Sequence, residues 1–127
     1  MKSVLTKEEY ESINGYFNAC NYVSAASLYL KDNALLKRPL TFDDIKPKLV
    51  GHWGSAPGQN FIYAHCNRVI KKYDLNMMYI SGPGHAGQSV MTNTYFEGSY
   101  QKYYPEFTQN EEGLTKFMRH FSVPGGT

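Results

Sequence analysis

Several features that would assign this chain to a functional class directly are scarce or missing. It has two cysteines, Cys20 and Cys66, and they lack the spacing of a CxxC motif or a zinc site. It has no run of about 18 apolar residues that could span a membrane, and its first residues do not form a secretory signal. These absences argue against a disulfide-stabilised secreted domain and against a membrane protein, and they favour a reduced, cytoplasmic setting.

The charge balance is equally modest. Thirteen Lys and Arg residues and eleven Asp and Glu residues give a formal net charge of +2. The densest basic cluster, Arg68, Lys71 and Lys72, lies near the end of an expected helix, where cations stabilise the helix dipole. This distribution does not indicate nucleic-acid binding. The GxGxxG and GxxxxGK[ST] motifs are absent, so the sequence supports neither a dinucleotide site nor a P-loop.

The chain is rich in aromatic side chains, with eleven Tyr, seven Phe and one Trp. Tyrosine joins an apolar ring to a polar hydroxyl, and it is enriched where surface is partly buried in pockets and interfaces. A chain of 127 residues fits one domain, which buries about two-thirds of the surface of the unfolded chain. The composition therefore predicts a single folded domain with partly buried tyrosines.

Hydrophobic periodicity predicts that most of the chain is helical. Thr6 and Glu9 form a capping-box pattern, which predicts a short helix to about Asn18. A second helical stretch is expected over residues 21–32, with Asn33 as its stop. Later helices are predicted from Pro57 to Tyr73, from Ser89 to Glu97 and from Glu111 to Phe121.

Residues 77–81 interrupt the helical pattern. They form a short apolar run bounded by turn signals, which is typical of a strand buried in a parallel sheet. The rest of the chain does not obviously supply neighbouring strands for it. The sequence therefore predicts an α/β fold that is helix-rich, with few parallel strands and an incomplete sheet.

Two histidines lie in glycine-rich turns. His85 follows the predicted strand in a GPGHAG turn at residues 82–87, and His52 lies in a GHWG turn at residues 51–54. Open α/β sheets bind ligands outside the carboxyl ends of their strands, where His85 is expected. The alternative is that both are ordinary loop histidines, satisfied by backbone or packing. Because two such turns occur in one small chain, we take His52 and His85 as candidate acid–base residues.

The glycines around His85 strengthen its candidacy. Gly82, Gly84 and Gly87 would allow positive φ and let a ligand approach without a Cβ in the way. A helix that begins near residue 87 would also direct free N–H groups into the same space, which favours an anion.

The other two histidines are weaker candidates. His65 lies on the apolar stripe of a predicted helix and fits a core position. His120 lies near a helix C-terminus, where it complements the dipole. No metal site is predicted, because His52, His65 and His85 lack ligand spacing and no carboxylate pair lies near them in the sequence.

Three stretches carry a more specific signal. They are GHWGSAPGQNFIYAH at residues 51–65, GPGH at 82–85 with NTYFEGSY at 93–100, and FSVPGG at 121–126. Together they closely resemble the N-terminal region of the xylulose-5-phosphate/fructose-6-phosphate phosphoketolases. The resemblance runs along almost the whole chain, in order and at the family's spacing. Ala86 stands where many relatives carry glycine, a change that a helix start tolerates.

The resemblance implies a thiamine diphosphate-dependent enzyme of the transketolase-like fold group. Such enzymes cleave a ketose phosphate with inorganic phosphate to give acetyl phosphate and an aldose phosphate. Residues 1–127 would be the opening part of the pyrophosphate-binding domain. His52 and His85 would face the reactive carbon of the cofactor and assist proton transfers and a dehydration, and Gly82, Gly84 and His85 would contact the cofactor.

The resemblance also implies parts that lie beyond Thr127. They are the next active-site histidine, a Gly-Asp-Gly motif for magnesium and diphosphate, and the glutamate that activates the thiamine ring. We therefore expect Mg²⁺ and thiamine diphosphate to be bound mainly outside residues 1–127, the isolated chain to be inactive, and the full-length protein to be a homo-oligomer. The alternative is a non-catalytic binding or assembly module that docks a partner through its tyrosine-rich surface.

Overall fold

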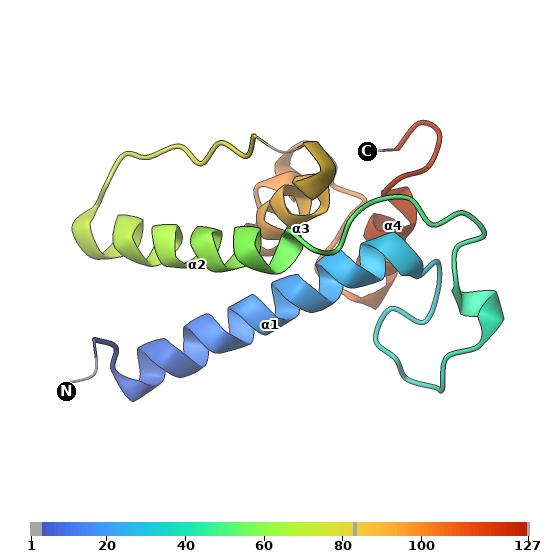
Figure 1. The fold of residues 1–127 in the computed structure, drawn as a ribbon, viewed down its shortest axis with the longest axis horizontal. Coiled ribbons are helices and arrows are strands. Elements are labelled where there is room, and N and C mark those ends of the chain that lie inside the picture. Colours follow the sequence, from blue (N-terminus) through green and yellow to red (C-terminus); the bar gives the residue numbers. More distant parts are fainter. Residues whose placement is uncertain (1–3, 83, 127) are drawn as a thin grey trace.

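Helices dominate the computed structural model, which describes residues 4–82 and 84–126 (Figure 1). Helices α1 and α2 lie side by side, and α3 packs against both of them. Helix α4 packs against α1. The α-helices are α1 (Lys7–Tyr29), α2 (Ala56–Tyr73), α3 (Gly87–Glu97) and α4 (Glu111–His120), and the short 3₁₀ helices are η1 (Phe42–Asp44), η2 (Gly84–Ala86) and η3 (Tyr100–Lys102).

Helix α1 is one continuous helix where two were predicted. The predicted capping box is confirmed: Glu9 N donates to Thr6 Oγ1 at 3.1 Å, and Thr6 N donates to Glu9 Oε2 at 2.8 Å. The expected break near residue 20 is absent because Cys20 is completely buried, with its thiol 3.5 Å from Asn93 Oδ1 of α3. Packing against α3 therefore holds the middle of α1 in helical form.

The predicted α/β fold is wrong for the described residues. Residues 77–81 carry no strand assignment and pair with no other segment, and Met78 and Ile80 are 83% and 79% exposed. The one strand-like contact in residues 4–82 and 84–126 is an isolated antiparallel bridge between Leu30 and Ile45. An apolar run becomes a strand only where neighbouring backbone satisfies its N–H and C=O groups, and the surrounding helices offer none.

The remaining helix predictions are confirmed to within two residues. Helix α2 begins at Ala56, one residue before the predicted start, and ends at Tyr73; its C-cap Asp74 has a left-handed φ of 50°. Helix α3 begins at Gly87 and ends at Glu97, and Gly98 is its left-handed C-cap with φ 82°. Helix α4 begins after Asn110, whose side chain accepts from Gly113 N at 2.9 Å.

An apolar core lies where the C-terminal half of α1 meets α3 and α4. Its aromatic centre is the pair Tyr95 and Phe117, whose ring centroids are 4.6 Å apart. Such pairs add stability beyond the area that they bury. The buried apolar residues of this core are Val23, Ala26, Leu30, Ala34, Tyr95, Phe107, Leu114, Phe117 and Met118.

The contact between α1, α2 and α3 is polar instead. Asn93 Oδ1 accepts from the Tyr16 hydroxyl at 2.7 Å, and Asn93 Nδ2 donates to Asn60 Oδ1 at 2.9 Å. Asn60 Nδ2 in turn donates to Asn21 Oδ1 at 3.0 Å. Asn60 and Asn93 are almost completely buried. A buried, satisfied network of this kind specifies the register of the three helices.

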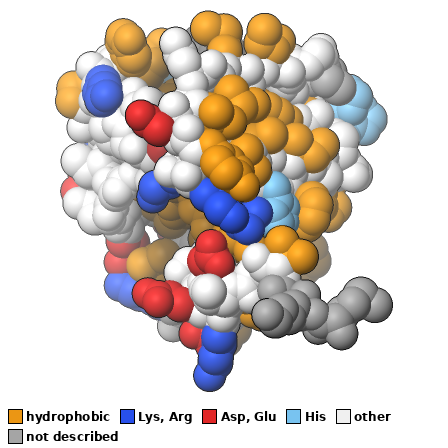
Figure 2. Space-filling model, turned by 90° about the vertical axis from the view of Figure 1, so that its left-hand side faces the viewer, with side chains coloured by type: hydrophobic (Ala, Val, Ile, Leu, Met, Phe, Trp, Pro, Cys, Tyr) orange, Lys and Arg blue, Asp and Glu red, His pale blue; other side chains and the backbone are white. Residues whose placement is uncertain are grey.

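Apolar side chains remain uncovered at the end of the molecule where α2 stops. Figure 2 shows hydrophobic side chains gathered on this end, and Tyr73, Met77 and Met78 are all more than half exposed. Within the described residues, no helix is both long and apolar enough to cross a membrane.

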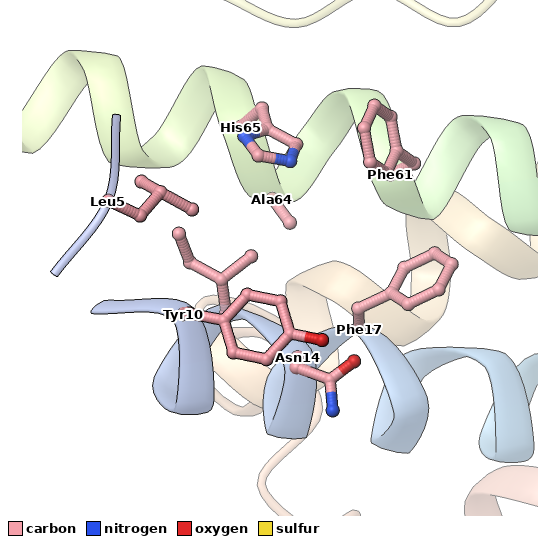
Figure 3. Close-up of a pocket in the computed structure, with 8 residues that line it drawn as sticks. Leu5, Tyr10, Asn14, Phe17, Phe61, Ala64 and His65 are labelled. Carbon is pink, nitrogen blue, oxygen red and sulfur yellow. The ribbon is translucent and has the colours of Figure 1, made fainter. Parts of the chain in front are cut away.

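A narrow apolar groove separates the N-terminal half of α1 from α2 (Figure 3). Phe17 of α1 and Phe61 of α2 meet edge to face across it, with ring centroids 6.1 Å apart. His65 is half-buried beside Phe61, at 4.4 Å between centroids. The predicted core position of His65 is therefore a position in the wall of this groove.

Candidate functional site

The two histidines singled out from the sequence lie side by side. The ring centroids of His52 and His85 are 5.2 Å apart, and the ring planes are inclined at 77°. His52 lies in the loop that precedes α2, and His85 lies in η2, which leads directly into α3. Both residues are exposed. The candidate site is therefore an accessible pair of imidazoles close to the N-terminal ends of two helices.

The backbone before His52 is fixed by a close approach to α1. Gly51 adopts φ 127°, a left-handed conformation that favours glycine. A Cβ at this position would overlap the Leu28 side chain of α1. After the histidine, Trp53 O accepts from Ala56 N at 3.0 Å, which closes the turn into α2. The GHWG motif is thus explained by a packed turn as well as by its histidine.

A buried cation anchors the segment that leads to this loop. Lys46 Nζ donates to three backbone carbonyls at 2.7 Å each: Ser27 O of α1, Met118 O of α4 and Phe121 O. Lys46 is only 6% exposed, and burial lowers its pKa to about 8. The three carbonyls belong to the C-terminal ends of helices, where a cation is favoured.

Gln88 is a residue of the site that sequence reasoning missed. It lies three residues after His85, is 1% exposed, and its Nε2 donates to the backbone carbonyl of His52. The next residue of α3, Ser89, has its Oγ 3.4 Å from Ala56 O at the start of α2. No motif points to Gln88. Its only sequence signal is a polar residue in the first turn of a predicted helix that starts beside a candidate histidine.

The glycines around His85 leave space rather than provide unusual dihedrals. A Cβ added at Gly82, Gly84 or Gly87 would meet nothing within 4 Å. Gly82 and Gly87 do not have positive φ, so the conformational freedom of glycine is not used there. Pro83 lies outside the described residues. The surface beside His85 is therefore open to a ligand.

The pair consists of two imidazole groups with no further metal-ligating side chain grouped with them in the described residues. Imidazole donates and accepts protons near neutral pH. In residues 4–82 and 84–126, no group of three His, Cys, Asp or Glu side chains could hold a metal ion. His120 packs on Phe107 instead, with ring centroids 5.1 Å apart.

Comparison with known proteins identifies the family. The family described as XFP N-terminal domain matches residues 4–127. A probable phosphoketolase of Rhodopirellula baltica is 55% identical over 122 residues, which cover 96% of this chain and 15% of the relative. Probable phosphoketolase 2 of Nostoc sp. is 53% identical over the same length. A probable phosphoketolase of Pediococcus pentosaceus is 51% identical over 126 residues, 99% of this chain and 16% of the relative.

The match includes both histidine turns, but it spans a small part of each relative. The chain covers about 15% of the length of the curated relatives that it matches. Within that part, the family match is continuous from residue 4 to residue 127. The chain therefore belongs to the phosphoketolase (XFP) N-terminal domain family.

Proposed function

We propose that this chain is the N-terminal part of a phosphoketolase, an aldehyde-lyase of carbohydrate metabolism, and that His52 and His85 move protons in its reaction. The full protein would convert xylulose 5-phosphate, fructose 6-phosphate or both, with inorganic phosphate, into acetyl phosphate, an aldose phosphate and water. Family membership supports the reaction class. The observation that carries the role of the histidines is their meeting at 5.2 Å from two separate turns.

The chemistry explains why two such groups would be needed. Cleavage of the ketose breaks a carbon–carbon bond, and formation of an acetyl group requires a hydroxyl to leave as water. Each event needs a positioned proton donor or acceptor, which typically contributes a factor of about 10² to 10⁴ in rate. His52 and His85 reach the same patch of surface from different elements, so they could serve neighbouring atoms of one bound substrate.

Thiamine diphosphate would supply the electron sink for the carbanion, while the protein supplies position and electrostatics. The described residues fit one end of this cofactor: His52 and His85 could face its reactive ring, with open surface at Gly82 and Gly84. They do not fit the other end, since the described part of the chain has no cluster of metal-ligating side chains for Mg²⁺. We therefore assign Mg²⁺ and the diphosphate to other parts of the full protein, which we expect to be a homo-oligomer.

Substitution in the full-length protein tests the role of the pair. His52→Asn and His85→Asn are each expected to lower kcat for acetyl phosphate formation by about 10² to 10⁴. The matched control is His65→Asn, because His65 lies in the wall of the groove beside Phe61; it should leave kcat nearly unchanged. Full activity of both site variants would contradict the proposal and favour a non-catalytic module.

The isolated chain provides a second test. With thiamine diphosphate, Mg²⁺, xylulose 5-phosphate and inorganic phosphate, residues 1–127 alone are expected to form no acetyl phosphate. Detection of the product as its hydroxamate, above the level of a His52→Asn control, would contradict the assignment of the remaining cofactor contacts to other parts of the protein.

A further inference from the structure

Three side chains in the first two turns of α3 donate hydrogen bonds to α2 and the loop before it. Gln88 bonds the carbonyl of His52, Ser89 lies 3.4 Å from Ala56 O, and Asn93 Nδ2 lies 2.9 Å from Asn60 Oδ1. The three donors, which we call the α3 ladder, are each at most 1% exposed. Their acceptors, His52 O in the loop before α2, Ala56 O at the start of α2 and Asn60 Oδ1 in its second turn, follow one another at four-residue intervals.

The covalent connection between the histidines does not fix their distance. From His52 the chain runs the length of α2 and returns along residues 75–82, most of which are exposed and none of which is part of a helix or strand. The loop of His52 and the turn of His85 are therefore held together by noncovalent contacts. Tyr79 and Ser81 bond Gln59 of α2 before the turn, and the α3 ladder joins the two segments after it.

Gln88 is the member of the ladder that acts on the histidine directly. Its Nε2 binds the backbone of His52, while its own backbone lies one helical turn after His85. Its other amide atom, Oε1, is buried and has no hydrogen-bond partner in the described part of the chain. A buried unpaired carbonyl opposes folding. The structural role of the Gln88 side chain is therefore the hydrogen bond that its Nε2 donates to the His52 carbonyl.

We propose that Gln88 is a positioning residue that holds His52 at its distance from His85. The catalytic part of this inference rests on the proposed function of His52 and His85, whereas the geometric part does not. Ser89 and Asn93 fix α3 against α2, and Gln88 transfers that alignment to the loop. Because proton transfer is sensitive to displacements of about 1 Å, loss of this one hydrogen bond would separate two groups that must act together.

The geometric test uses the 127-residue chain and two-dimensional NMR. In the wild type we expect nuclear Overhauser effects between the ring protons of His52 and His85, given their centroid distance of 5.2 Å. Gln88→Met keeps the length of the side chain and removes the donor, and it should abolish this effect. Gln88→Glu, which places an acceptor against the His52 carbonyl, should abolish it too.

The matched control is Gln101→Met. Gln101, in η3, also donates from Nε2 to backbone carbonyls, Tyr95 O at 3.3 Å and Phe107 O at 2.9 Å. These bonds lie near the C-terminal end of α3, away from the two histidines. It should preserve the histidine–histidine effect. Effects between the rings of Tyr95 and Phe117 report that each variant is folded. Retention of the histidine–histidine effect in folded Gln88→Met and Gln88→Glu would overturn the proposal.

The catalytic test uses the full-length protein. Gln88→Met is expected to lower kcat by about 10- to 100-fold with little change in KM, and to add little to His52→Asn, because the two residues act as a unit. An unchanged kcat in Gln88→Met, where His52→Asn is inactive, would overturn the positioning role. If His52→Asn is also fully active, the proposed function fails while the NMR result still decides the geometry.

Discussion

At the scale of single residues, the carboxylate of Asp44 is a buried charge held by several hydrogen bonds. Its side chain is 1% exposed. It accepts from Arg38 Nη1 at 2.7 Å, and from the backbone N and the hydroxyl of Thr41 at 2.9 and 3.0 Å. These bonds, that of Arg38 first and that of the Thr41 backbone next, hold the pKa of Asp44 well below its ordinary value. Asp44 thereby stabilises the segment that leads through Lys46 to His52.

Acid should therefore weaken the protein through Asp44. Because the pKa of this carboxyl is lower in the folded than in the unfolded chain, its contribution is fully present above pH 3.8, the ordinary value, and is lost as the pH falls through the folded pKa. Asp44→Asn should lower Tm at pH 7 and show a smaller further loss below pH 3.8 than the wild type.

Thermal denaturation followed by circular dichroism between pH 2 and pH 7 measures this difference. Asp43→Asn is the control, because Asp43 is the exposed neighbour in η1. If Asp44→Asn and Asp43→Asn have the same Tm at every pH, the assigned role of Asp44 is wrong.

At the scale of elements, buried amides join α3 to α1 and α2. Asn93 contacts Tyr16 of α1 and Asn60 of α2 at once. Removal of this amide takes away the acceptor of the part-buried Tyr16 hydroxyl and the donor to the buried Asn60 Oδ1. We expect Asn93→Ala to reduce the free energy of unfolding by about 1–3 kcal/mol or more.

Urea denaturation with linear extrapolation gives this free energy. Asn18→Ala is the matched control, because Asn18 is an exposed asparagine of α1; it should change stability by less than about 0.5 kcal/mol. Equal values for the two variants would show that the polar contact does not hold the helices in register.

Apart from the false break inside α1, the helices were predictable because their signals are local. Thr6 with Glu9 marks the start of α1, and Gly98 marks the end of α3. The strand was wrongly predicted because an apolar run such as residues 77–81 specifies only a preference, whereas a strand needs a partner. The two histidines were identified because glycine turns are visible in sequence. Gln88 was not, since its role depends on the approach of α3 to the His52 carbonyl, which only the tertiary structure shows.

At the scale of the whole molecule, much apolar surface is uncovered. Ile80 and Met78 are 79% and 83% exposed, and the groove between α1 and α2 is lined mainly by apolar and aromatic side chains (Figure 3). Exposed apolar patches and unpaired extended backbone both favour association. Residues 1–127 should therefore self-associate as their concentration rises.

Sedimentation velocity over a range of concentrations measures this association. The double substitution Met78→Lys with Ile80→Lys should shift the chain toward monomer, because it places charge on the exposed segment. Asn18→Lys, which adds charge at an exposed polar position of α1, should not. A wild-type chain that stays monomeric at all concentrations would refute this expectation.

Lys46 links the C-terminal ends of α1 and α4 to the segment that leads to His52. One ammonium group is bound at once by the carbonyls of Ser27, Met118 and Phe121, so it acts as a common cap for the ends of α1 and α4. The residue lies six positions before His52, and Phe121 directly precedes the turn at residues 122–126. A displacement of that turn would therefore be transmitted through a single cation to the loop that carries the histidine.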